Sequence, residues 1–164
     1  MPARPRNVLF LCTGNSARSI MAESLLEGLG RGRYRAFSAG SRPAGAVNPL
    51  ALDLLGRHGL PTAGLRSKSW DEFAPPGAPV MDLIFTVCDS AAAEPCPVWP
   101  GHRATAHWGF PDPAAVEGTE ETRRAAFERV FASLRARIEA FLALPVESLP
   151  SAELKARLGV LGSG

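Results

Sequence analysis

A cysteine and an arginine six positions apart could carry out nucleophilic chemistry on an anion. Eight residues connect an apolar run to a segment of helical periodicity: Cys12, Thr13, Gly14, Asn15, Ser16, Ala17, Arg18 and Ser19. Such a loop turns its backbone amides inward and adds the positive end of a helix dipole, so it is suited to bind an oxyanion. Arg18 adds a planar fork of donors. The same field favours a thiolate on Cys12, because helix N-termini and nearby cations lower cysteine pKa values.

Individual residues of the loop support this interpretation. Gly14 is expected to allow the backbone conformation that the turn demands, and Asn15 tolerates left-handed geometry better than most residues. The Ser19 hydroxyl is placed to donate a further hydrogen bond to the Cys12 sulfur. The alternative is a buried strand-end cysteine followed by an N-capping loop, but the flanking strand and helix favour the anion-binding interpretation.

Two more cysteines follow a second apolar run. Cys88 ends the run over 83–87, and Cys96 lies eight residues further on, in a stretch rich in alanine and proline. Both thiols could simply be buried packing residues. A zinc site with His102 and His107 is a further alternative, although the spacings match no familiar zinc motif, and we predict no metal site.

Apolar runs alternate with helical patterns along the chain. We expect strands at 8–11, 34–39, 83–87 and 103–108, and helices at 17–29, 48–57 and 122–142. A single helical turn at 70–73, a helical turn or mobile loop at 89–93 and a short helix at 152–158 complete the prediction. Strands that are apolar throughout and alternate with helices indicate a parallel sheet covered on both faces. In such sheets ligands bind beyond the carboxyl ends of the strands, where Cys12 and Cys88 both lie.

Composition limits the classes of function. The chain has 164 residues, 46% of them hydrophobic, and a formal net charge of +2. We expect one domain over 1–164, with a core at about 7–143 and a C-terminal tail at 145–164. The low charge does not favour nucleic acid as a partner, and no apolar run is long enough for a membrane span. Three cysteines fit a secreted disulfide scaffold badly, so a cytoplasmic location is expected.

The motif Cys-x5-Arg-Ser between the first strand and the first helix resembles that of the low-molecular-weight protein tyrosine phosphatases and the thiol-dependent arsenate reductases related to them. The resemblance covers about Asn7 to Ala143 and includes three further segments, at 21–23, 38–40 and 112–113. It implies a three-layer, doubly wound sheet of four parallel strands. It also implies that Cys12 is the nucleophile, Arg18 the oxyanion clamp and Asp112 the proton donor.

Two chemistries share this loop in the family. A phosphatase needs Cys12, Arg18 and Asp112 and would hydrolyse a phosphate monoester through a phosphocysteine. Its phosphotyrosine-specific members present aromatic residues after the Asp-Pro pair, where this chain has alanines at 114 and 115. A third hypothesis is a binding protein that keeps the Cys12 loop but catalyses no reaction, and that senses an oxyanion or a phosphopeptide.

An arsenate reductase needs further thiols close to the first. The segments 87–100 and 107–110 closely resemble those of arsenate reductases, which implies that Cys88 resolves the adduct on Cys12 and that Cys96 then takes over the disulfide. Such an enzyme binds no cofactor but consumes a thiol reductant, either thioredoxin or a glutathione-type thiol with glutaredoxin, and Cys96 favours a thioredoxin-like partner. Arsenate reduction is therefore the main hypothesis.

The chain also departs from the family pattern. Some arsenate reductases carry a cysteine where this chain has Ala17. Some relatives bind a monovalent cation through residues matching Asn15, Glu23 and Ser38, but no clearly acidic fourth ligand occurs near Ser69, so we do not predict that site. The remaining candidates are interpreted structurally: His58 as a helix-capping residue, and Trp70, Trp99 and Trp108 as side chains at the rim of the site and the edge of the core.

Overall fold

The computed structural model describes residues 5–30, 32–73, 77, 79–87, 104–146 and 148–163. Its four strands are β1 (Arg6–Cys12), β2 (Tyr34–Gly40), β3 (Leu83–Thr86) and β4 (Ala104–His107). They form one sheet in the order β2-β1-β3-β4, and every pairing is parallel. The predicted fold class is therefore confirmed, and the strand boundaries differ from the prediction by two residues at most.

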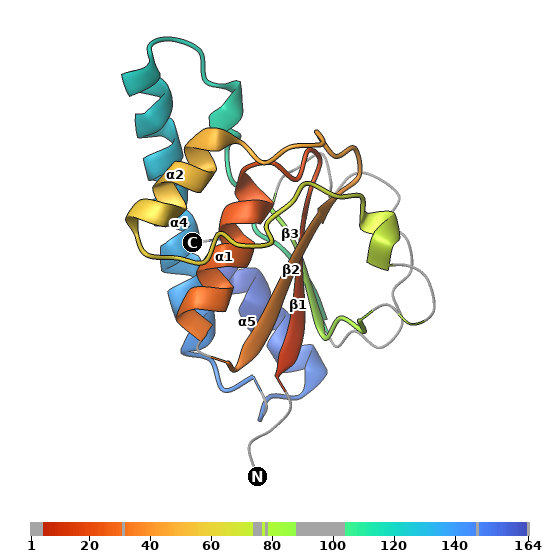
Figure 1. Ribbon diagram of the computed structural model, residues 1–164. Helices are drawn as coiled ribbons and strands as arrows, with labels where there is room; N and C mark the ends of the chain where they lie inside the picture. The colour runs from red at the N-terminus through yellow and green to blue at the C-terminus, as the bar shows by residue number, and fades with distance from the viewer. Residues whose placement is uncertain are drawn as a thin grey trace.

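The helices lie mainly on one side of this sheet (Figure 1). They are α1 (Arg18–Gly30), α2 (Pro49–Arg57), α4 (Glu120–Leu142) and α5 (Ser151–Ser163), together with the 3-10 helices η1 (Trp70–Phe73) and η2 (Pro113–Ala115). Asn48 caps α2 with Pro49 at its first position, and Thr119 caps α4. Side-chain caps satisfy amides that a helix start leaves without partners. His58 ends α2 as its C-cap, as predicted.

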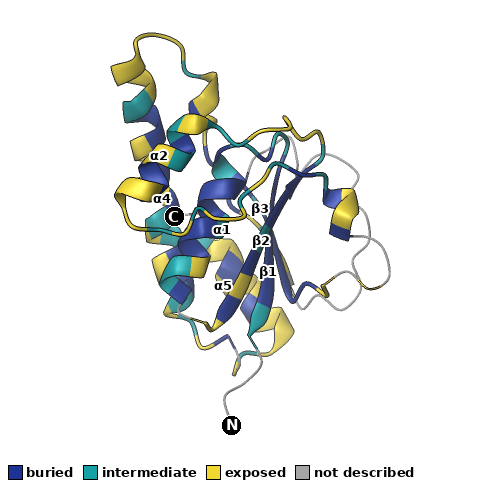
Figure 2. Cartoon of the chain, viewed as in Figure 1, coloured by how far each residue is buried: buried dark blue, intermediate teal, exposed yellow. Residues whose placement is uncertain are grey.

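Alternating side chains of β1 divide the core in two, because successive residues of a strand point to opposite faces. Val8, Phe10 and Cys12 belong to the larger cluster with α1, α4 and α5. Leu9 and Leu11 belong to the smaller cluster, which η1 covers with Trp70 and Phe73. Both faces of the sheet are thus buried (Figure 2).

The C-terminal segment forms a longer helix than the sequence suggested. We expected helix at 152–158, whereas α5 runs from Ser151 to Ser163. Leu154 and Leu158 are fully buried in the larger cluster. Trp108, which we had placed at the rim of the site or the edge of the core, is fully buried, and its Nε1 donates to the Leu158 carbonyl at 2.9 Å. The prediction for Trp108 was wrong because α5 covers the end of β4.

The strand order fixes where a ligand can bind. The chain passes from β1 to β2 on one side and then to β3 on the other, so β1 and β3 flank the switch point of the sheet. Doubly wound sheets bind their ligands beyond the strand ends at such a point. Cys12 is the last residue of β1 and therefore lies at the switch point.

Candidate active site

Cys12 is a buried thiol, only 2% exposed, surrounded by hydrogen-bond donors. Its Sγ lies 2.9 Å from Ser19 Oγ and accepts from the Asn15 amide at 3.2 Å. Ser19 Oγ itself accepts from Asn15 Nδ2 at 2.8 Å, so the hydroxyl proton of Ser19 remains available for the sulfur. Donors that converge on sulfur stabilise the thiolate more than the neutral thiol. The contact between Ser19 and the sulfur agrees with the expectation from the sequence.

Asn15 is the residue that orients these donors. It is fully buried, and its φ of 46° is the only positive φ of a non-glycine residue among those that the structure describes. Its Oδ1 accepts from the Lys68 amide at 2.9 Å. Because a backbone amide can only donate, this contact also fixes the side-chain Nδ2 toward Ser19. The left-handed position expected of the turn falls on Asn15, whereas Gly14 has no positive φ, so the role assigned to Gly14 was wrong.

Four carbonyl groups of the loop face the segment 41–48. The carbonyls of Cys12, Thr13, Gly14 and Ser16 accept from the amides of residues 41, 42, 44 and 48, at 2.9–3.3 Å. In a trans peptide the carbonyl and the following N–H point in opposite directions. The amides of residues 13, 14, 15 and 17 therefore point to the other side of the loop, and the Asn15 amide shows that this is the side of the Cys12 sulfur.

The inward amides are candidates for binding an anion. Within the described part of the chain, the inward amides of Gly14 and Ala17 donate to no protein acceptor. They lie at the N-terminus of α1, where the helix dipole is positive. Partly exposed amides that surround a thiol are suited to hold a tetrahedral oxyanion above it.

Arg18 connects this loop to the segment after β4. Its Nη1 donates to the Phe110 carbonyl at 3.0 Å, and its Nη2 lies 3.6 Å from Asp112 Oδ2. The other Asp112 oxygen accepts from the Ala114 amide and caps η2. Asp112 is thus both a turn residue that caps η2 and a carboxylate beside the loop. Its side chain is 42% exposed.

Gly40 lies at the site, and the sequence alone does not indicate why a glycine is required there. It pairs with Cys12 at the end of β2. A Cβ at this position would collide with the Thr13 carbonyl oxygen and would lie 3.0 Å from the Cys12 carbonyl oxygen. Only glycine lets the two strand ends approach so closely that the loop can form.

A buried polar cluster lies beneath the loop and consists of Glu23, Ser38 and Lys68. The Ser38 hydroxyl donates to Glu23 Oε1, and Lys68 Nζ lies 3.9 Å from the same oxygen. Burial raises the pKa of Glu23, with the Ser38 hydrogen bond and the Lys68 charge acting against it. Burial also lowers the pKa of Lys68, and Glu23 opposes that shift. Lys68 was missed in the sequence analysis, because a lone lysine in an irregular segment gives no signal of burial.

The other predicted thiols lie outside the described residues, as do His102, Trp99 and the turn at 89–93. The described chain reaches Val87, whose amide donates to the Leu11 carbonyl at 2.8 Å, beside the end of β1. His107 ends β4, and its Nδ1 lies 2.7 Å from Thr86 Oγ1. The structure therefore places Cys12, Arg18, Ser19 and Asp112 together, and the roles of Cys88 and Cys96 stay predictions.

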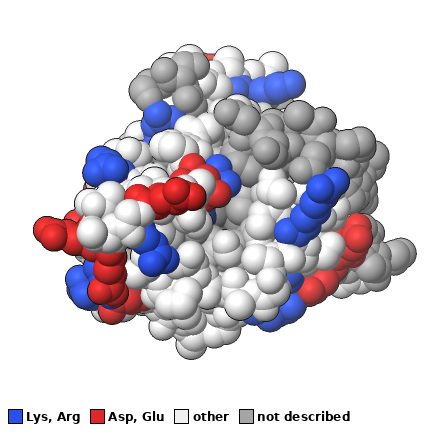
Figure 3. All heavy atoms as spheres, turned by 90° about the horizontal axis from the view of Figure 1, so that it is seen from above, with Lys and Arg blue, Asp and Glu red and all other residues white. Residues whose placement is uncertain are grey.

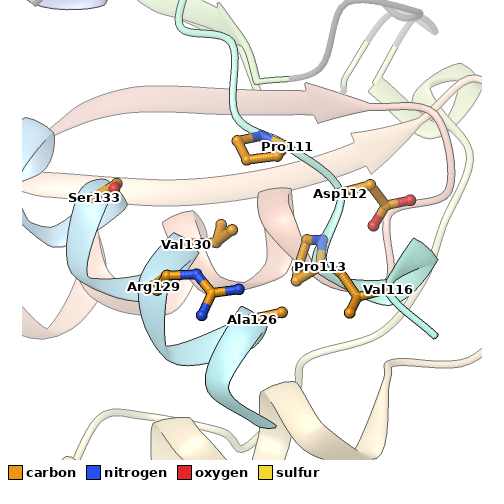
Figure 4. Close-up of a pocket in the computed structure, with 8 residues that line it drawn as sticks. All are labelled: Pro111, Asp112, Pro113, Val116, Ala126, Arg129, Val130 and Ser133. Atoms are coloured by element: carbon orange, nitrogen blue, oxygen red, sulfur yellow. The ribbon is translucent and has the colours of Figure 1, made fainter. Parts of the chain in front are cut away.

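A hollow of about 220 Å³ adjoins the site on the far side of Asp112. It lies between η2 and α4, with Pro113 and Val116 facing Val130, and the Asp112 carboxylate points away from α4 (Figure 4). No residue of the Cys12–Ser19 loop lines this hollow. The hollow is therefore separate from the loop that surrounds the Cys12 sulfur.

Known proteins with this combination of loop and fold identify the family. The family model described as low molecular weight phosphotyrosine protein phosphatase matches residues 7–156. The chain belongs to this family. An arsenate reductase from Bacillus licheniformis is 38% identical over 136 residues, which cover 83% of this chain and 94% of that protein.

Solved structures of the family have the same fold. An arsenate reductase from Archaeoglobus fulgidus superposes with a TM-score of 0.66 at 28% identity, over 84% of this chain and 99% of that one. A thioredoxin-dependent arsenate reductase from Corynebacterium glutamicum superposes with a TM-score of 0.61 at 22% identity, over 86% of this chain. This chain spans 62% of the length of the Corynebacterium protein, and that similarity shows the fold alone. Among the described residues of this family member, no helix is both long enough and apolar enough to cross a membrane.

Proposed function

We propose that the protein is an arsenate reductase that converts arsenate to arsenite through Cys12 and two further thiols. The observation that carries the proposal is the Cys12 sulfur, which accepts from Ser19 and Asn15 on the side of the loop toward which its inward amides point. Arsenate has the tetrahedral shape and charge that such amides bind. Identity of 38% to a protein named arsenate reductase favours this substrate over a phosphate ester.

The first step is attack on arsenic. The loop amides and Arg18 hold arsenate, and the Cys12 thiolate forms a sulfur–arsenic bond while one arsenic–oxygen bond breaks. Asp112 supplies a proton, and the oxygen leaves as water. Arsenic remains As(V) in this adduct, so no electrons have yet been transferred.

Reduction takes place when a second thiol attacks sulfur. The Cys88 thiolate attacks Cys12 Sγ, a disulfide forms, and the bonding electron pair leaves with arsenic, which departs as arsenite. Cys96 then attacks Cys88, frees Cys12 and leaves a Cys88–Cys96 disulfide. A thiol reductant, with thioredoxin proposed first, reduces this disulfide. The cycle requires a reducing compartment, so we propose a cytoplasmic location.

The test compares Cys88→Ser with wild type in two assays. One assay couples arsenate to NADPH consumption through thioredoxin and its reductase, or through glutathione and glutaredoxin. The other measures hydrolysis of p-nitrophenyl phosphate. We expect Cys88→Ser to abolish arsenate-dependent NADPH consumption and to retain ester hydrolysis, whereas Cys12→Ser abolishes both.

A mass measurement supplies the matching chemical readout. Arsenate-treated wild type should lose two hydrogens and yield a peptide pair cross-linked through Cys88 and Cys96. A wild-type protein that turns over no arsenate with either thiol system but hydrolyses esters rapidly would establish the phosphatase alternative instead.

A further inference from the structure

Lys68 places its charge inside the protein, beneath the Cys12 loop. The residue is 8% exposed, and its Nζ donates to the Arg66 carbonyl at 2.9 Å. Its other neighbour is Glu23 of α1, whose Oε1 lies 3.9 Å away and accepts from Ser38 of β2. The ammonium therefore joins the segment 66–68 to α1, and through Glu23 to β2.

The main chain of Lys68 contacts the loop itself. Its amide donates to Asn15 Oδ1, and its carbonyl accepts from the Gly40 amide, both at 2.9 Å. Asn15 in turn donates through its backbone amide to the Cys12 sulfur. In this chain of hydrogen bonds, Asn15 is the only residue between Lys68 and the Cys12 nucleophile. Asn15 is also the loop residue with the left-handed backbone conformation.

Glu23 requires a positive partner at this depth. A buried carboxylate without a counter-charge is costly, and removing one member of a buried pair leaves the other uncompensated. The raised pKa of Glu23 and the lowered pKa of Lys68 both arise from burial, and each charge offsets part of the shift of the other. Arg66 is the next cation, but it pairs with Glu72 at the surface.

The resemblance to the family implies a monovalent cation held by residues matching Asn15, Glu23 and Ser38. These residues do not fit a free cation here, because the Lys68 ammonium already lies against the Glu23 carboxylate and donates to the Arg66 carbonyl, an oxygen that could otherwise serve as a ligand. We propose that Lys68 is a positioning residue that acts as the built-in cation of the nucleophile loop, so that the protein needs no added monovalent cation. This proposal deepens the proposed function, since it names what holds the nucleophile, but its test does not involve arsenate.

The test separates charge from size at position 68. Lys68→Met fills the space without charge, Lys68→Ser opens room beside Glu23, and Lys68→Arg keeps the charge. All three keep the backbone amide that holds Asn15. Lys155→Met, on the exposed side of α5, is the matched control for the loss of a lysine.

The readouts are thermal stability and the rate at which iodoacetamide alkylates Cys12, followed by peptide mass spectrometry at pH 7. Each protein is measured in KCl and in choline chloride at equal ionic strength. Wild type, Lys68→Arg and Lys155→Met should be the same in both salts. Lys68→Met should react at least 5-fold more slowly in both, and Lys68→Ser should be slow in choline and recover at least half of its loss in KCl.

Two results would overturn the proposal. One is a wild-type alkylation rate or melting temperature that rises in KCl relative to choline, because the site would then use an external cation. The other is equal loss in Lys68→Met and Lys68→Arg, because side-chain shape rather than charge would then matter. Neither result bears on arsenate turnover, which the Cys88→Ser comparison decides separately.

Discussion

At the scale of single residues, the reactivity of Cys12 depends on where its neighbours direct their protons. Asn15 donates to both Cys12 and Ser19, and Ser19 is left with one proton that can point only to the sulfur or to empty space. The buried thiol is therefore set up by a short chain of hydrogen bonds that begins at the Lys68 amide. Breaking one link should change the protonation of the sulfur without removing the loop.

Ser19→Ala tests that link. A hydrogen bond to a charged group contributes about 1.5–3 kcal/mol, which corresponds to roughly one to two pH units in a thiol titration. We expect the pH of half-maximal Cys12 alkylation to rise by about one unit and the turnover at pH 7 to fall about tenfold. Ser133→Ala, on the exposed side of α4, should leave the alkylation profile unchanged. An unchanged profile in Ser19→Ala would show that the hydroxyl does not donate to the sulfur.

Glu23 and Glu72 should make the stability depend on pH with opposite signs. Burial raises the pKa of Glu23 above its ordinary 4.5, so its contribution to stability is complete below 4.5 and is lost as the pH rises through the folded value. The Arg66 hydrogen bond lowers the pKa of Glu72, so its contribution is present above 4.5 and is lost as the pH falls through the folded value.

Urea unfolding between pH 3 and 7 measures both effects. The stability of wild type relative to Glu23→Gln should increase as the pH falls from 7 toward 4.5. The stability of wild type relative to Glu72→Gln should decrease as the pH falls below about 5. This decrease should be small, because Glu72 is largely exposed. If the stability difference changed with pH in the same direction for both variants, burial of Glu23 and pairing of Glu72 with Arg66 could not both be correct.

Sequence analysis could identify these residues only where their chemistry is local. Cys12, Arg18 and Ser19 lie within one strand–loop–helix motif, so their proximity follows from short-range geometry. The contact between Asn15 and Lys68 joins positions 53 apart, and nothing in the spacing predicts it. The tolerance of Asn15 for left-handed geometry is a local property, so it could be predicted, whereas the Lys68 amide and the segment 41–48 that hold this conformation could not.

At the scale of elements, the loop takes its shape from β2 and the segment that follows it. Four loop carbonyls accept from amides of the segment 41–48, and the end of β2 supports the loop at Gly40. The inward direction of the anion-binding amides is thus a consequence of bonds made on the opposite side. Strands and helices could be predicted because their apolar periodicity is strong, whereas α5 was predicted too short because glycines at 159 and 162 weaken its helical signal.

Gly40→Ala tests the support from β2. The added Cβ would collide with the Thr13 carbonyl oxygen and lie 3.1 Å from Asn15 Cβ. Overpacking of this kind typically costs 1–3 kcal/mol. We expect a lower melting temperature and at least a tenfold loss of turnover, because the loop carbonyls must move.

Gly56→Ala is the matched control for Gly40→Ala. Gly56 lies within α2, its φ is not positive, and a Cβ there would meet nothing within 4 Å. Alanine is favoured over glycine in helices by about 1 kcal/mol, so this variant should be slightly more stable and fully active. If Gly40→Ala matched the stability and activity of Gly56→Ala, the close approach at β2 would not be required.

At the scale of the whole molecule, the net charge of +2 says little about the ligand, because the charge that binds it is local. Seen from the end toward which the strands run, positive and negative side chains are dispersed over the surface (Figure 3). The strand order brings the end of β1 to the switch point, and the amides of one loop with Arg18 supply the positive potential there. Overall charge could not have predicted such a site, whereas the strand–loop–helix motif did.

The C-terminal helix completes the core on the side of β4. Leu158 is fully buried beside Trp108, whose indole donates to the Leu158 carbonyl. Truncation of a buried leucine to alanine typically costs about 2–5 kcal/mol, so Leu158→Ala should lower the melting temperature by roughly 5–15 °C. Val160, two residues further along α5, is 71% exposed, and Val160→Ala should change stability by no more than about 0.5 kcal/mol.

Calorimetric melting of both variants measures the difference in stability, and NMR follows the exchange of the Trp108 indole proton. Because the backbone carbonyl of residue 158 is retained, faster indole exchange in Leu158→Ala would report that α5 has loosened from β4. Equal melting temperatures for the two variants would mean that α5 does not belong to the cooperative core.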